Sequence, residues 1–180
     1  MKTWGSRIWL AADLVFAASA SAFAQTTVTL PDTSQTTTVS ANVSEQARVI
    51  VPSGITFNVT NIGVSTVASA ATVTVDQIVT ATATKQLKLS LQANAASFTP
   101  PVGGATTWAA TDVSWNAAAW TNATGSTGTL SNSAYTTVAT CQADAAACST
   151  TGLVFTLAAK ATVQRSGTHT LVVTWKFESI

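Results

Sequence analysis

Three tryptophans are the residues best placed to take part in ligand chemistry in this chain. Trp108, Trp115 and Trp120 lie within thirteen residues of one another, in a segment rich in Ala and Thr. Flat indole rings can stack on the C–H faces of sugar rings, which would make the segment a carbohydrate-binding platform. Indoles also bury large apolar areas, so the three rings could instead form a small secondary core over one end of a domain. The sequence favours the core but leaves both interpretations open.

The residues needed for hydrolytic catalysis are scarce. His169 is the only histidine, and no serine lies in a Gly-x-Ser-x-Gly turn that would expose a nucleophile. A glycosidase needs two carboxylates that face each other across a cleft. The acidic residues after position 24 are far apart in the sequence: Asp32, Glu45, Asp76, Asp112, Asp144 and Glu178. We therefore predict no catalytic residues and no enzymatic activity.

Two cysteines, Cys141 and Cys148, are separated by six residues. Zinc would need two further ligands, and His169 is the only imidazole. The chain also lacks the carboxylate run of a calcium loop, and Gly103-Gly104 is not followed by the lysine of a phosphate-binding loop. We expect no metal and no cofactor. An even number of cysteines in an oxidising compartment is typical of a disulfide, and we predict a structural one here.

The N-terminus has the features of a secretory signal peptide. Lys2 and Arg7 precede an apolar run over residues 8–20, and Ala22-Phe23-Ala24 resembles a cleavage site. We predict cleavage after Ala24, which leaves no membrane span in the mature chain. The protein would then be secreted, periplasmic or at the surface of a bacterium. With eight Lys/Arg against seven Asp/Glu in the whole chain, no basic patch is available for nucleic acid.

Alternation of apolar and polar residues predicts β-strands throughout the mature chain. In residues 86–92, Leu87, Leu89 and Leu91 share one face. We expect residues 153–164 and 168–177 to form an antiparallel hairpin, closed by a turn that contains Gly167. Weaker alternation predicts further strands at residues 36–43, 47–51, 55–59, 72–84 and 135–140.

This pattern favours an all-β fold, an antiparallel immunoglobulin-like β-sandwich of about seven to ten strands over residues 36–180. Residues 103–128 would be a Trp-rich insertion in it. Residues 25–35 are rich in Thr and would form a flexible segment outside the core.

The export signal, the Thr/Val-rich strands and the closing segment at residues 167–177, Gly-Thr-His-Thr-Leu-Val-Val-Thr-Trp-Lys-Phe, resemble bacterial secreted immunoglobulin-like sandwiches. The similarity is to pilin-like and spore-coat-U-like surface subunits and covers residues 36–177. It implies a structural or adhesive role at the cell surface and transfers no catalytic residues.

The N-terminal segment suggests how such a subunit would assemble. Val28 and Leu30 alternate with polar residues, as do Val39, Ala41 and Val43, and these stretches could add as strands to a second copy. Alternatively, residues 36–43 are the first strand of their own sandwich and residues 25–35 a frayed tail. We expect a non-enzymatic surface subunit whose partner is itself, in an oligomer or fibre, or another surface protein. The alternative is a module that binds a glycan or another ligand through Trp108, Trp115 and Trp120.

Overall fold

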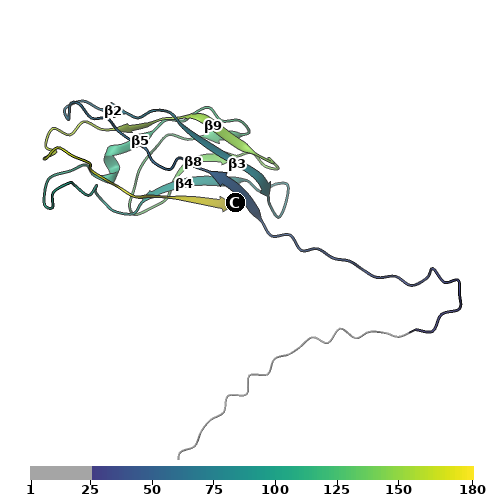
Figure 1. Cartoon of the computed structure of the whole chain (residues 1–180). Helices are drawn as coiled ribbons and strands as arrows, with labels where there is room; N and C mark the ends of the chain where they lie inside the picture. The colour runs from purple at the N-terminus through teal and green to yellow at the C-terminus, as the bar shows by residue number, and fades with distance from the viewer. Residues whose placement is uncertain (1–25) are drawn as a thin grey trace, which may run out of the picture. The chain divides into compact units, whose positions relative to one another are not determined.

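The computed structural model of the chain describes residues 26–180 (Figure 1). The predicted signal peptide, residues 1–24, lies outside the described residues. The compact unit is Asn42–Ile180, and the described residues up to Ala41 belong to a separate unit. No helix within residues 26–180 is both long enough and apolar enough to cross a membrane.

The compact unit is built from β-strands, as predicted, with one short 3-10 helix, η1 (Ala110–Asp112). Every pairing between strands is antiparallel. Residues 26–180 contain eleven strands: β1 (Gln46–Ile50), β2 (Thr66–Val67), β3 (Ala71–Val79), β4 (Leu87–Ala93), β5 (Val113–Trp115), β6 (Ala123–Gly125), β7 (Gly128–Thr129), β8 (Thr136–Cys141), β9 (Cys148–Leu153), β10 (Phe155–Leu157) and β11 (Val173–Ser179).

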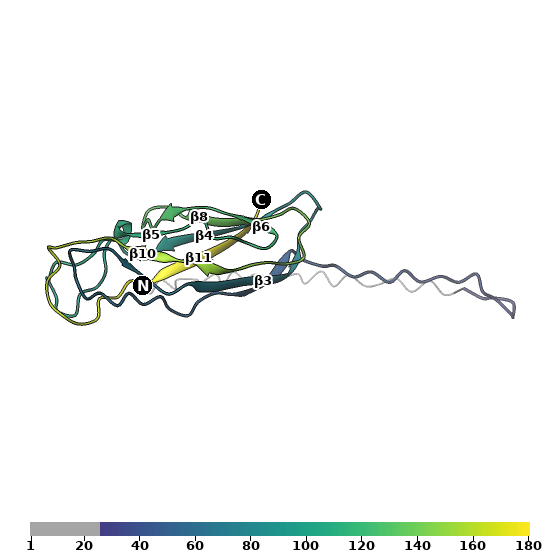
Figure 2. The same ribbon diagram turned by 90° about the horizontal axis from the view of Figure 1, so that it is seen from above.

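These strands form three sheets, with the orders β1-β3-β9, β2-β10-β5-β7 and β11-β4-β8-β6. The first two sheets are joined because the chain passes directly from β9 to β10 at Val154. Together they cover one side of the core, and the third sheet covers the other (Figures 1 and 2). The result is a β-sandwich.

The alternation read from the sequence gives the buried faces. Leu87, Leu89 and Leu91 of β4 are all buried, which confirms the strand predicted at residues 86–92. In β3, Val73 and Val75 face the same core from the opposite sheet. Strands β1, β3 and β8 correspond to those predicted at residues 47–51, 72–84 and 135–140, with ends that differ by up to five residues.

The predicted C-terminal hairpin is wrong. β11 pairs with β4 over its whole length, with Trp175 opposite Leu91 and Phe177 opposite Leu89 (Figure 2). β10 pairs instead with β2 and β5, and residues 158–172 form no strand. Alternation in the sequence predicts which face of a strand is buried, but it does not predict which other strand pairs with it. Pairing with β4 puts two aromatic rings next to its leucine row, whereas Ala159 and Ala161 have little apolar surface to bury.

Two further strand predictions and one domain prediction differ from the structure. Residues 36–43 form no strand and are exposed, and residues 55–59 are extended but unpaired. Residues 103–128, expected to be an insertion, contribute η1, β5 and β6 and so belong to the sandwich. Their Ala- and Trp-rich composition hid the short alternation of Val113 and Trp115, both of which are buried.

The predicted disulfide between Cys141 and Cys148 is confirmed. Cys141 ends β8 in one sheet and Cys148 begins β9 in another, so the bridge links the two sides of the sandwich. Both residues are about 1% exposed. The disulfide is therefore part of the core and does not merely close a loop at the surface.

Candidate functional site: an apolar groove

A groove of about 1280 Å³ opens between two stretches of chain that run along the sandwich. One wall is formed by residues 51–60, which continue β1. The other is formed by residues 165–173, which lead into β11. We call these the first wall and the second wall. The space between them reaches the core.

The first wall forms no strand and has no partner strand. Ile55, Phe57 and Val59 point inward and pack against the core, while the residues between them are exposed. For residues 52–60, however, the structure holds only one backbone hydrogen bond, from the Val59 N–H to the Phe57 carbonyl at 3.1 Å. The first wall thus presents backbone donors and acceptors that no other strand satisfies.

The second wall is attached on one side only. The backbones of Thr99 and Thr170 bond to each other in both directions, at 2.7 and 3.0 Å. Beyond them β11 pairs with β4 and forms the edge of its sheet. The opposite edge of β11 faces no strand in the described chain. Both walls of the groove are therefore sheet-like edges with free backbone groups, which readily accept another strand.

The chain bends at Ser166 and Gly167, at the start of the second wall, although the hairpin predicted around this turn does not form. Arg165 and Gly167 both have positive φ, 71° and 127°, and glycine adopts such a conformation without strain. A Cβ at Gly167 would also lie 3.0 Å from the Pro101 ring. This turn directs residues 168–173 along the groove.

His169 fixes the second wall in place. Its Nδ1 lies 2.7 Å from the Thr107 hydroxyl, and its Nε2 lies 3.2 Å from the carbonyl oxygen of Arg165. The imidazole also meets the Trp108 ring edge-on, with 5.3 Å between ring centroids. Both ring nitrogens are used in structural contacts, and no carboxylate orients the ring. This geometry does not suit the general base of a triad.

The floor of the groove is apolar. It consists of side chains from β4, β10 and β11 and from two segments outside the strands, chiefly Leu91, Trp108, Leu130, Phe155, Leu157 and Trp175. The only Lys or Arg that lines the groove is Arg165, at its rim, and no Asp or Glu lines it. An occupant must therefore offer apolar side chains to the floor and backbone hydrogen bonds to the walls.

The tryptophan segment lies in the core. Trp108 and Trp115 are 5% and 4% exposed, and their indole N–H groups donate to the carbonyls of Ala158 and Ser126, both at 3.0 Å. Trp120 is partly buried against the core. A Cβ at Gly128 would collide with the Trp115 indole, so the absence of a side chain there makes room for the ring. Neither Trp108 nor Trp115 presents a free ring face to a sugar.

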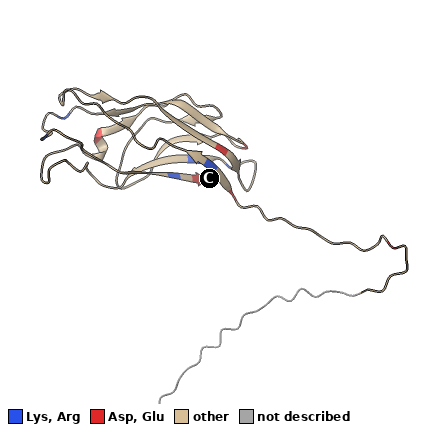
Figure 3. Ribbon diagram, viewed as in Figure 1, with Lys and Arg blue, Asp and Glu red and all other residues tan. Residues whose placement is uncertain are grey.

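Four of the acidic residues, Glu45, Asp76, Asp112 and Glu178, take part in ion pairs. Arg48 donates to Asp76 at 2.6 Å and Lys160 to Asp112 at 2.9 Å. The hydrogen bond from Arg48 is the main reason that the pKa of Asp76 is lowered. Charges are sparse over the sheets (Figure 3). Within residues 26–180, no group of three His, Cys, Asp or Glu side chains could hold a metal ion.

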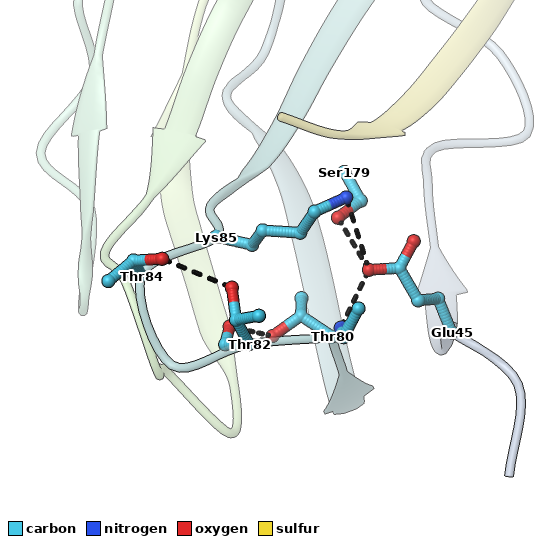
Figure 4. A network of polar contacts seen from close by, with 7 residues as sticks. Glu45, Thr80, Thr82, Thr84, Lys85 and Ser179 are labelled. Carbon is cyan, nitrogen blue, oxygen red and sulfur yellow. Dashed lines mark hydrogen bonds and ion pairs between the residues drawn. The ribbon is translucent and has the colours of Figure 1, made fainter.

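One polar network joins the two strands that continue into the walls (Figure 4). Glu45 Oε1 accepts hydrogen bonds from the Ala81 N–H at 2.7 Å and the Ser179 hydroxyl at 3.0 Å, and lies 3.5 Å from Lys85 Nζ. The Ala81 bond is the main cause of the lowered pKa of Glu45. The network ties the residue before β1 to the last residue of β11. The groove lies farther along the same two strands, where they separate.

Comparison with known proteins adds no assignment. No protein-family model matches the chain, and no curated protein or solved structure is similar to it. The fold and the groove are therefore the basis for assigning a function.

Proposed function

We propose that this protein is a non-enzymatic structural subunit of the bacterial cell surface, which assembles with copies of itself by strand addition. In this proposal the groove of one copy binds the N-terminal segment, residues 26–43, of the next copy. The observation that carries the proposal is the groove itself, in which two unpaired edges flank an apolar floor.

A β-strand satisfies each property of this site. Its backbone can hydrogen-bond to both walls, and alternate side chains can enter the space above Leu91, Phe155 and Trp175. The inward side chains of the incoming strand would lie beside those of the first wall, on the face that meets the core. Pairing would also cover the free edge of β11, which proteins usually protect.

The N-terminal segment suits this role. In residues 26–43 the structure has no strand, and apolar side chains are exposed, with Leu30 82% and Val39 92% accessible. Leaving such side chains in water forgoes the free energy of their burial, about 25 cal/mol per Å². Asp32 is the only charged residue of the segment. A second copy is thus a suitable partner, because its N-terminal segment carries one charge and has exposed apolar side chains that match the floor of the groove.

Other features agree with a surface location. A disulfide within the core is typical of proteins from oxidising compartments. The predicted signal peptide would export the chain, and the sandwich is compatible with the immunoglobulin-like resemblance. The structural contacts of His169, and the ion pairs that Asp76 and Asp112 form with basic side chains, support a role without catalysis.

Light scattering after size-exclusion chromatography, with electron microscopy of the same sample, tests the proposal. We expect oligomers or fibres that grow with protein concentration. Ile55→Lys places a charge on the inward face of the first wall and should give monomers. The matched control Thr56→Lys points outward and should assemble. Circular dichroism checks that both variants are folded. If the unaltered chain stays monomeric at high concentration, the proposal is wrong.

A further inference from the structure

We infer that residues 36–43, and not residues 26–30, are the part of the N-terminal segment that enters the groove. Neighbouring subunits are then joined by only two residues, Ser44 and Glu45, before β1 begins at Gln46. This inference rests on the proposed function and specifies how its partner binds.

The two apolar stretches of the segment cannot face the groove together. Val28 and Leu30 occupy even positions, whereas Val39, Ala41 and Val43 occupy odd ones. Side chains alternate strictly between the faces of a strand, so one continuous strand would turn the two sets to opposite sides. Only one set can meet the apolar floor, and the other must remain outside.

The earlier stretch is interrupted by a polar turn. Pro31 has no backbone N–H to donate to a wall. The Asp32 carboxylate then accepts hydrogen bonds from the Ser34 N–H at 2.9 Å, the Ser34 hydroxyl at 2.6 Å and the Gln35 amide at 2.9 Å. The backbone bends at Leu30 and Pro31, so a straight strand cannot continue beyond Leu30. A strand that included this turn would also have to bring the Asp32 charge over the apolar floor.

The later stretch fits the length and chemistry of the groove. The first wall spans ten residues, 51–60, or at most roughly 33 Å at 3.3 Å per residue. Residues 36–43 extend over about 26 Å and residues 26–30 over only about 17 Å. Residues 36–43 contain no proline and no charge. With Val39, Ala41 and Val43 inward, Thr38, Ser40 and Asn42 face solvent.

The position of the segment next to β1 determines the form of the assembly. With residues 36–43 bound, successive domains must lie almost in contact, which gives a stiff fibre. With residues 26–30 bound, residues 31–45 would form a linker of up to about 50 Å, and the domains would be loosely strung. Residues 26–35 are dispensable in the first arrangement and essential in the second.

Three variants of the full chain distinguish the two arrangements. Deletion of residues 26–35 should leave fibres intact, with the same spacing between subunits in electron micrographs. Val39→Lys should abolish fibres, because it brings a charge to the floor. The matched control Thr38→Lys turns its charge to solvent and should assemble. These changes lie outside the core of the unit Asn42–Ile180, so they leave its folding unaffected.

A binding assay gives an independent measurement. A chain that lacks residues 26–43 keeps the groove, and its tryptophan fluorescence includes Trp175 on the floor. A peptide of residues 35–44 should bind and change this fluorescence. A peptide of residues 26–35, or the first peptide with Val39→Lys, should bind at least about tenfold more weakly because of its charge.

The outcomes separate this inference from the function on which it rests. If the deletion of residues 26–35 yields monomers while Val39→Lys still forms fibres, the earlier stretch is the bound one. The inference is then overturned and the proposed function stands. If the unaltered chain forms no assembly and neither peptide binds, both are overturned.

Discussion

Removing the Cys141–Cys148 bridge should lower the free energy of unfolding by about 2.5 kcal/mol. The bridge closes a loop of eight residues, counted with both cysteines. For n = 8 the loop entropy is roughly −8 cal/mol/K, which gives this free energy at 25 °C. The substitution should be Cys141→Ala with Cys148→Ala, since serine would bury two hydroxyls at positions only about 1% exposed.

The native loop itself should change little in this double variant. Asn122 holds it independently, because its carbonyl accepts from the Gln142 N–H at 2.8 Å and its side-chain amide donates to the Ala147 carbonyl at 3.2 Å. The loss of stability should therefore come mainly from the greater freedom of the unfolded chain.

Urea unfolding followed by tryptophan fluorescence measures this loss. The midpoint should fall, and the unaltered protein in reductant should approach the double variant. The slope against urea should rise slightly, because an unfolded chain without a cross-link exposes more surface. A double variant as stable as the disulfide-bonded protein would refute the reasoning that the bridge constrains the unfolded state.

Three further predictions concern packing and charge. Trp175→Ala should lower the free energy of unfolding by about 2–3 kcal/mol, because the ring is partly buried beside the leucines of β4. The control Lys176→Ala lies on the other face and should lower it by under about 1 kcal/mol. Equal losses in urea unfolding would mean that the register of β11 is wrong. Gly128→Ala should cost about 1–3 kcal/mol because its methyl group meets the Trp115 ring, whereas Gly54→Ala has open space and should be nearly neutral in thermal unfolding. The pKa of Glu45 is lowered from 4.5 in the folded state, chiefly by the Ala81 N–H, so its contribution to stability is present above that value and lost as pH falls through the folded pKa. Glu45→Gln should therefore show a smaller fall in melting temperature below about pH 4.5 than the unaltered protein, and an unchanged acid profile would contradict the role of the network.

The sequence was most informative about which face of a strand is buried and least informative about which strands pair with each other. Alternation identified the inward side chains of β4 because a strand has a period of two, which does not depend on its partner. The partner of β11 depends on how large side chains fit across the core, and nearness in sequence pointed to a hairpin instead. The disulfide was predictable from the even number of cysteines together with the predicted export signal.

The groove was not predictable in the same way, because it exists where no strand lies between the two walls. Residues 55–59 and 168–177 both alternate like half-buried strands, and nothing in either pattern indicates that the space between them is open. The short strands β5 and β6 escaped detection because three residues give too little alternation to recognise. The sequence shows that residues 36–43 alternate in the same way, but only the structure shows that they form no strand of their own domain.

The Glu45 network also bears on how a fibre would carry mechanical load. A pull transmitted through residues 36–43 reaches the domain at Glu45, whose carboxylate is anchored to Ala81 and Ser179. Beyond it, β1 lies antiparallel to β3, so tension along β1 acts on several ladder bonds at once rather than opening them singly. The Glu45 carboxylate also connects the start of β1 to the end of β11. In the proposed fibre, β11 binds the N-terminal segment of another copy. Force could thus pass from one joint to the next along the edges of the sandwich, while the buried disulfide keeps its two sides from separating.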